Sequence, residues 1–295
     1  MDSKKLEIFM TAADLGSFTR ASDVVGYTQS GLTHMMNTLE KEIGFPLLRR
    51  GHNGIQLTEQ GERLMPAIRE FLRANANLEK QIRIIGEQKT EVIRIAAYAS
   101  IAMHWMPEIL YRFRRQCPEV KVDLRMVDHA LEPFELLETG QTDVIFASKQ
   151  NYPCNWIPLY KEKLYAILPK DHPVTYTDQF PLEDFAGQEF IMPYGRFDND
   201  VRAAMEPVGV KLNAQPSKVD DETVIRMVGR GLGLSMMSEL MIRGRTDDVQ
   251  CIPVYPPAVR ELGMGTHLRA KETEGIRMLK ACVMEFVGEM LNAEC

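Results

Sequence analysis

Apolar residues between Gly16 and Ile43 recur at intervals of three and four, a spacing that predicts two short amphipathic helices joined by a turn. Ser17 can cap the first helix, and Gly26 can end it because glycine adopts the left-handed backbone conformation without strain. Thr28 can cap the second helix. The apolar face of that second helix is formed by Leu32, Met36, Leu39 and Ile43.

The opposite face of the second helix carries short or flat polar side chains: Gln29, Ser30, Thr33, His34 and Asn37. Such side chains can form hydrogen bonds with base edges, and a helix-turn-helix places its second helix in the major groove. The alternative is a polar face that only meets solvent. We predict that this helix, with Thr28 at its start, contacts DNA.

The segment after this helix is predicted to form a β-hairpin, because two short extended runs flank a turn-forming His52-Asn53-Gly54. Arg49, Arg50 and His52 at its tip suit contact with phosphates or with the minor groove. A hairpin exposed only to solvent is the alternative. A further helix, ending at Leu15-Gly16, is predicted to pack beneath the helix-turn-helix.

A heptad stripe follows, from Thr58 to about Gly86, and predicts a long helix that pairs with another helix. The stripe consists of Leu64, Ile68, Phe71, Asn75, Leu78, Ile82 and Ile85. Its polar member, Asn75, can specify register at a cost in stability. Pro66 predicts either a kink or a helix whose regular part starts nearby. Packing against the rest of the same chain is the alternative to a dimer seam.

From Glu91 onward, strands and helices alternate, which implies parallel strand pairing with crossover helices. We predict strands at residues 92–97, 120–127, 144–147, 163–169, 190–192 and 263–269, and helices at 106–116, 198–208, 221–229 and 271–291. The last strand returns toward the first part of this α/β region.

Residues in both halves of the chain resemble those of LysR-type transcriptional regulators. In the first sixty residues the resemblance is carried by Leu6, Phe9, Gly16-Ser17-Phe18, Ala21, Gln29-Ser30, Leu39-Glu40, Gly44, Leu47, Arg50, Leu57-Thr58 and Gly61. In the second half it is carried by Pro107, Phe113, Pro118, Val120, Leu137, Gly140, Asp143, Pro169, His172-Pro173, Leu182, Phe190-Ile191 and Gly231-Leu232-Gly233. Leu48 and His34 depart from the family, which usually has phenylalanine and a basic residue there. The neutral His34 could make DNA binding sensitive to pH.

The resemblance implies an α/β protein with an N-terminal all-α winged helix-turn-helix and a two-subdomain effector domain like a periplasmic binding protein. We expect a DNA-binding domain at residues 1–58, a dimerising linker helix at 59–89 and an effector domain at 90–295. Subdomain I would span about 90–160 and 268–295, and subdomain II about 161–267. The family dimerises through this linker and often forms tetramers.

Composition fits a soluble globular protein, with 45% hydrophobic and 26% charged residues among 295. No apolar run is long enough to span a membrane and the start lacks a secretory signal, so we expect a cytoplasmic protein. The net charge of −6 is unusual for a DNA-binding protein. Residues 1–58 hold six basic and six acidic side chains, which predicts weak non-specific affinity and reliance on a dimer or larger assembly.

No enzymatic motif is present, so we predict no catalytic residues, no cofactor and no metal. The five cysteines form no CxxC pair and the six histidines lack metal-ligand spacing. Gly229-Arg230-Gly231-Leu232-Gly233 has the wrong spacing for a nucleotide-binding loop. Cys154 and Cys251 leave a thiol switch open as an alternative, although nothing nearby predicts a lowered pKa.

A small-molecule site is expected at the strand ends and helix N-termini that face a cleft between two α/β subdomains, where anionic groups are favoured. The resemblance places Ser100 at this cleft. Arg196 could clamp a carboxylate or could pair with Asp198 on the surface. The effector-binding residues that we predict are Ser100, Ile101, Asp128, His129, Ser148, Arg196, Phe197 and Thr266.

The helix-turn-helix pattern and the resemblance together imply a regulator that binds double-stranded promoter DNA and senses a small, anionic effector. An effector that favours one arrangement of the domains would shift the population toward it and alter promoter binding or contact with RNA polymerase. One rival interpretation is a ligand-binding module whose N-terminal domain serves assembly without specific DNA binding. The other is an enzyme of solute-binding-like fold, which the missing catalytic set opposes.

Overall fold

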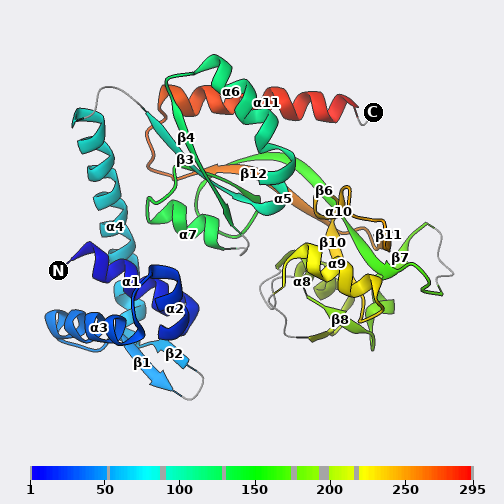
Figure 1. Ribbon diagram of the computed structural model, residues 1–295, viewed down its shortest axis with the longest axis horizontal. Coiled ribbons are helices and arrows are strands. Elements are labelled where there is room, and N and C mark those ends of the chain that lie inside the picture. The colour runs from blue at the N-terminus through cyan, green and yellow to red at the C-terminus, as the bar shows by residue number, and fades with distance from the viewer. Residues whose placement is uncertain are drawn as a thin grey trace. The chain divides into compact units, whose positions relative to one another are not determined.

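The computed structural model describes residues 2–51, 54–86, 91–127, 131–173, 178–192, 199–215 and 219–293. The chain divides into two compact units (Figure 1). The first consists of Met1–Lys89 with Glu138–Gln141, and the second of Thr90–Leu137 with Thr142–Cys295. In the described part of the chain, no helix is both long enough and apolar enough to span a bilayer.

The first unit contains the predicted helix-turn-helix and hairpin. Its elements are α1 (Ser3–Leu15), α2 (Phe18–Val25), α3 (Gln29–Ile43), β1 (Leu48–Gly51), β2 (Gly54–Leu57) and α4 (Glu59–Gly86). The side chains of Ser17 and Thr28 accept hydrogen bonds from backbone amides in the first turns of α2 and α3, so both predicted caps are confirmed. Gly26 ends α2 with a left-handed φ of 71°, also as predicted.

The hairpin formed by β1 and β2 is fixed to the rest of the first unit by a backbone hydrogen bond and by the carboxylate of Glu40. The amide of Ile55 donates to the carbonyl oxygen of Gly16 at 2.9 Å. Gly54 has a φ of 103°, and a Cβ atom there would lie 2.4 Å from the same carbonyl oxygen, so this turn requires glycine. One carboxylate oxygen of Glu40 accepts from the amides of Leu47 and Leu48, at 2.6 and 2.9 Å. These bonds fix the start of β1 against the C-terminal half of α3.

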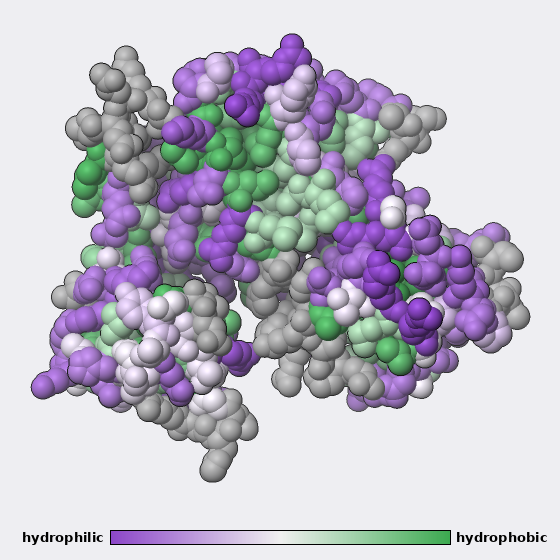
Figure 2. Space-filling view, viewed as in Figure 1, coloured by the Kyte–Doolittle hydropathy of each residue, from purple (hydrophilic) through white to green (hydrophobic). Residues whose placement is uncertain are grey.

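Near its start, helix α4 buries a face that overlaps the predicted stripe at Ile68. Ile68 and Leu72 belong to the core of the first unit, together with Leu6, Phe9 and Leu39. Pro66 lies inside the helix. The stripe continues with Phe71, Leu78 and Ile82, whose exposed fractions are 40%, 58% and 59%. Figure 2 shows hydrophobic side chains on the surface of α4.

The second unit is organised by one mixed sheet in the order β4-β3-β5-β12-β6-β11-β7, with β10 also pairing β6. The strands are β3 (Val92–Tyr98), β4 (Lys121–Val127), β5 (Val144–Ser148), β6 (Asn155–Pro169), β7 (Phe180–Pro181), β10 (Ser235–Ser238), β11 (Val249–Tyr255) and β12 (Val259–Thr266). Strand β3 is parallel to β4 and β5, which confirms the parallel pairing expected from the alternation. Strand β12 runs antiparallel to β5 and β6.

Helices cover this sheet and enclose separate hydrophobic cores. The first core lies between the sheet and α5 (Ala99–His104), α6 (Met106–Gln116), α7 (Glu132–Glu138) and α11 (Glu274–Ala293). In Figure 1, α6 and α11 lie on one side of the sheet and α7 on the other. Further cores lie in the second subdomain, around the outer half of β6, which contributes Leu164, Ala166 and Ile167 to them.

The second subdomain holds the remaining elements. They are a short 3₁₀ turn (Leu182–Phe185), β8 (Glu189–Ile191), α8 (Asn199–Met205), a second 3₁₀ turn (Glu206–Val208), β9 (Asn213–Gln215), α9 (Asp221–Gly229) and α10 (Glu239–Ile242). Strands β6 and β12 connect the two subdomains. Leu262 and Met264 of β12 belong to the first core.

Several elements differ from the sequence prediction. Strand β6 starts at Asn155 rather than at 163, because the antiparallel partner β12 continues the ladder past Pro158. Strand β12 is correspondingly Val259–Thr266 and not 263–269. Strand β4, in contrast, agrees with the strand predicted at 120–127; it lies at an edge of the sheet, and its apolar side chains Leu124 and Met126 are exposed. Figure 2 shows hydrophobic side chains gathered over β4 and α5.

Candidate DNA-binding and effector sites

The polar face of α3 is available to a partner. The side chains of Gln29, Ser30, His34 and Asn37 are exposed and that of Thr33 is half-buried, whereas Leu32, Met36 and Leu39 face the core. Spacings of three and four along one helix put the five polar residues on a common side. The structure therefore brings together the base-contacting residues that the sequence predicts.

Thr28 is the N-cap residue of this helix. Its Oγ1 accepts from the amide of Gly31 at 3.1 Å and lies 3.2 Å from the hydroxyl of Ser30. The cap leaves the first turn of α3 at the surface, where amide groups and the helix dipole favour a phosphate.

The hairpin supplies the predicted basic side chains. Arg49 is exposed on β1, where it pairs in register with Gln56. Arg50 pairs in register with Ile55, but its side chain and all of His52 lie outside the described residues. Lys4 and Lys5 form ion pairs with Glu7 and Glu42, at 3.1 and 2.5 Å. These pairs favour the hairpin over α1 as the source of positive charge for DNA.

In the second unit, two of the predicted effector residues meet at a buried polar cluster. Its centre is Arg260 on β12, whose side chain is 3% exposed. The Nη2 of Arg260 donates to the Oγ of Ser100 at 3.1 Å, and its Nη1 lies 3.4 Å from the Oδ2 of Asp200. Ser148 donates from its Oγ to the Oδ1 of Asp200 at 2.8 Å. We call Ser100, Ser148, Glu162, Asp200 and Arg260 the arginine cluster.

Glu162 completes the cluster from β6, directly opposite Arg260 in the strand register. Its carboxylate is fully buried and accepts from the Nε of Arg260 at 2.6 Å and from the amide of Leu240 at 2.5 Å. A buried charge needs such pairing, because desolvation would otherwise make the charged form very unfavourable. The pair holds the guanidinium group in place on the two strands that connect the subdomains.

The remaining effector predictions do not join the cluster in the described structure. Ile101 is fully buried in the first hydrophobic core. Thr266 pairs with Val144 at the start of β5, whereas Ser148 is at the opposite end of that strand, so Thr266 lies about four residues away along the sheet. Four of the predicted residues lie outside the described part of the chain: Asp128, His129, Arg196 and Phe197. The carboxylate clamp predicted for Arg196 therefore stays a prediction.

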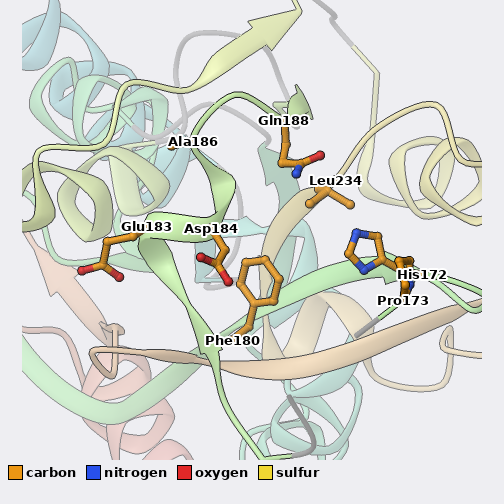
Figure 3. A pocket seen from close by; sticks show the side chains of 8 residues that line it. All are labelled: His172, Pro173, Phe180, Glu183, Asp184, Ala186, Gln188 and Leu234. Carbon is orange, nitrogen blue, oxygen red and sulfur yellow. The ribbon is translucent and has the colours of Figure 1, made fainter. Parts of the chain in front are cut away.

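A separate surface depression of about 300 Å³ lies in the second subdomain. It is lined by His172, Pro173, Phe180, Glu183, Asp184, Ala186, Gln188 and Leu234. Figure 3 shows the rings of His172 and Phe180 together with the carboxylate of Asp184, while Glu183 points away. The lining residues offer no nucleophile beside a base. Within the described residues, no three potential metal ligands gather anywhere.

The cysteine thiols that the structure describes are poorly suited to a redox switch. Burial raises the pKa of Cys117, Cys154 and Cys282, and it raises the pKa of Cys251 to about 11. The reactive species is the thiolate, so these shifts lower reactivity at neutral pH. The structure thus favours packing roles for these side chains.

Two family matches cover most of the sequence. Residues 3–62 match the family described as bacterial regulatory helix-turn-helix protein, lysR family, and residues 86–287 match the LysR substrate binding domain. The chain belongs to the LysR family of transcriptional regulators. It is a DNA-binding regulator with a helix-turn-helix domain and an effector-binding domain.

Individual relatives and solved structures agree with this assignment. The chain is 26% identical over 245 residues to an uncharacterized HTH-type transcriptional regulator, YvbU, of Bacillus subtilis, covering 83% of this chain and 84% of the relative. It is 26% identical over 264 residues to the hydrogen peroxide-inducible genes activator of Haemophilus influenzae, covering 87% of each. Full-length BenM has the same fold, with a TM-score of 0.61, 20% identity and 98% coverage of both chains. CbnR in complex with its target DNA gives a TM-score of 0.55 at 19% identity, covering 97% of this chain and 100% of CbnR.

Glu162, Asp200 and Arg260 are not among the residues predicted from the sequence. The ion pair joins residues 98 positions apart, and no local pattern reports such a pairing. A weak signal existed, since Arg260 stands near the start of the otherwise largely apolar run that became β12.

Proposed function

We propose that this LysR-family regulator reads promoter DNA with Gln29, Ser30, Thr33, His34 and Asn37 on α3. The observation that supports this proposal is that the polar face of α3 is exposed. Amide, hydroxyl and imidazole groups at this spacing can reach successive base edges in the major groove. CbnR, which has the same fold, is known in complex with its target DNA.

Arg49, Arg50 and His52 of the hairpin, with the first turn of α3 at Thr28, are proposed to hold the phosphate backbone. Such contacts fix the register of a protein on DNA and carry most of the salt dependence. The even balance of charge in residues 1–58 limits non-specific affinity. Two DNA-binding domains, one from each copy of a dimer, would compensate for the low affinity of a single domain by binding one promoter together.

The α4 helix is proposed to join two copies of the chain. Phe71, Leu78 and Ile82 continue a heptad stripe and are exposed in the single chain. Burying such side chains is worth about 25 cal/mol per Å² of apolar surface, and a second α4 offers a matching stripe. Further association into a tetramer would use another surface, and the exposed Leu124 and Met126 on the edge strand β4 provide one.

A small-molecule effector is proposed to bind at Ser100 and Ser148, where the two subdomains meet. A ligand that contacts both subdomains in one arrangement stabilises that arrangement, and the population shifts by the difference in affinity. The shift would change the spacing or angle of the paired DNA-binding heads and their contact with RNA polymerase. The protein is proposed to act without catalysis.

Promoter binding is tested by fluorescence anisotropy of the full chain on its own upstream DNA and on a scrambled duplex, across a salt series. With two arginines from each of two heads on phosphates, the log–log slope should be about −4. The upstream duplex should bind at least about tenfold more tightly than the scrambled one. Equal affinity for both duplexes at every salt concentration would favour the rival ligand-binding module.

Residue roles are tested with Asn37→Ala and Arg49→Ala. The first should reduce discrimination between the two duplexes by about 1–3 kcal/mol. The second should weaken binding to both and reduce the magnitude of the slope by about two, because each of the two heads loses one phosphate contact. Thr38→Ala is the matched control, since the hydroxyl of Thr38 donates to the carbonyl oxygen of His34 within the helix. Identical effects of all three substitutions would contradict the assignment.

The dimer is tested by light scattering of the Leu78→Glu/Ile82→Glu variant. Two charges within the seam should convert the dimer to monomer at micromolar concentration and should weaken promoter binding. Glu70→Lys changes the charge of α4 away from the stripe and should leave the dimer intact. A variant that remains dimeric would show that α4 is not the seam.

A further inference from the structure

The donors of the arginine cluster converge on a carboxylate that the protein itself supplies. Asp200 belongs to the first turn of α8 in the second subdomain, whereas Ser148 lies at the end of β5 in the first. The hydroxyl of Ser148 and the Nη1 of Arg260 both point hydrogen atoms at the Asp200 carboxylate, at 2.8 and 3.4 Å. The neighbouring Asn199 adds a second bridge, donating to the Oε1 of Gln150 at 3.1 Å.

The two carboxylates around Arg260 are held to different degrees. Glu162 is fully buried, accepts at 2.6 Å and is anchored by a backbone amide. The side chain of Asp200 is 19% exposed and its contact with Arg260 is longer. Solvent reaches Asp200 but not Glu162, so Asp200 is the carboxylate that an incoming group can replace.

We propose that Asp200 is a resident carboxylate occupying the position that the carboxylate of the effector takes when it binds. This inference rests on the proposed effector site and names its ligand class, a small organic carboxylate. A ligand that replaces Asp200 must accept hydrogen bonds from Ser148 and Arg260. An ammonium group would instead face the positive charge of Arg260.

Replacement of Asp200 also connects binding to movement. Asp200 and Asn199 attach α8 to the end of β5, so a ligand that takes the donors of Asp200 releases that turn of α8 from the first subdomain. The ligand and Asp200 cannot bind the same donors at the same time. The free energy of this competition is the coupling free energy between effector binding and the arrangement of the two subdomains. Arg260 stays in place throughout, because Glu162 holds its Nε edge.

Chemical rescue with acetate tests this proposal in the full-length protein. Asp200→Ala removes the carboxylate and leaves a gap of about its size beside Ser148 and Arg260. Sodium acetate at about 100 mM, compared with sodium chloride at equal ionic strength, should raise the melting temperature of the variant by about 3 °C. Acetamide has the same shape without the charge and should not raise it.

Matched variants separate a carboxylate site from general effects of acetate. Asp200→Asn fills the gap with a neutral group and should not respond. Asp220→Ala removes a capping carboxylate at the start of α9, in the same subdomain, and should be destabilised without acetate rescue. Adding Ser148→Ala to Asp200→Ala removes a donor and should reduce the rescue.

A rise of the same size in sodium chloride, in acetamide or in the Asp220→Ala variant would overturn the proposal. If Asp200→Ala does not yield folded protein, Asp200→Ser takes its place, because the smaller hydroxyl leaves part of the same gap. Promoter binding by the unmodified protein is measured separately. Loss of rescue with intact promoter binding refutes the carboxylate site alone, and rescue without promoter binding refutes the regulator's proposed DNA contacts alone.

Discussion

Replacing Glu162 by alanine should destabilise the second unit strongly. The substitution leaves the buried guanidinium of Arg260 without its 2.6 Å partner and the amide of Leu240 without an acceptor. Removing one member of a buried ion pair costs about 3–5 kcal/mol, and each kcal/mol lowers the melting temperature of a unit of this size by about 2–4 °C. We therefore expect a melting temperature lowered by about 10 °C.

The assay can observe the second unit alone. The chain has two tryptophans, and both Trp105 and Trp156 belong to or pack on the first core of the second unit. Tryptophan fluorescence during heating therefore reports unfolding of that unit without a contribution from the DNA-binding unit. The control is Glu289→Ala, which removes an equally short contact of 2.6 Å to Arg112. Because Glu289 is exposed, its loss should hardly change the transition.

A double variant separates the cost of an unpaired buried charge from the loss of the Glu162–Arg260 contact itself. Glu162→Leu with Arg260→Met replaces the pair by apolar side chains, so no unpaired charge remains buried, and the variant should be more stable than Glu162→Ala. Two results would refute the reasoning. One is a Glu162→Ala variant that melts within about 2 °C of the unmodified protein. The other is a double variant that is less stable than the single one.

Three further substitutions or measurements follow from the structure. Gly54→Ala should weaken promoter binding and destabilise the first unit by about 2 kcal/mol, because the new Cβ would meet the carbonyl oxygen of Gly16; an unchanged affinity would argue against a fixed hairpin. Glu40→Ala should lower promoter affinity because two amides of the hairpin lose their acceptor, while Glu40→Gln should retain most of it. Alkylation of Cys251 at pH 8 should be about 100-fold slower than in the unfolded chain, since its pKa is raised from 9.0 to about 11. The alkylation rate should rise with pH up to that value, and mass spectrometry of labelled peptides checks it.

Local chemistry made the first unit predictable. Ser17, Thr28 and Gly26 act within a few residues of their own positions, so capping and left-handed turns can be read from neighbours in sequence. The heptad stripe of α4 was equally visible, and the structure adds that Phe71, Leu78 and Ile82 are exposed. The contact of Glu40 with the hairpin was not predicted, because its importance depends on where the chain returns after Gly44.

Long-range pairing limited the prediction of the second unit. Strand β6 was predicted from 163 only, because its first half contains Pro158 and has no regular alternation; its pairing with β12 supplies the order. The arginine cluster is assembled from five separate strands and helices, so only Ser100 and Ser148, which stand at or just after the ends of predicted strands, could be found. Asp200 follows no strand and lies within the predicted helix at 198–208, where no sequence pattern distinguishes it.

The contact between Glu40 and the hairpin also limits which promoters can be bound. One carboxylate oxygen attaches the start of β1 to α3, so the side chains proposed to read bases and those proposed to hold phosphates keep a constant separation. Base substitutions within a half-site change the hydrogen bonds made by α3 but leave the phosphate contacts of the hairpin unchanged. A base pair inserted between the two contacts would shift one of them along the DNA by about 3.4 Å. Half-site length, unlike half-site sequence, is therefore set by a contact inside the protein.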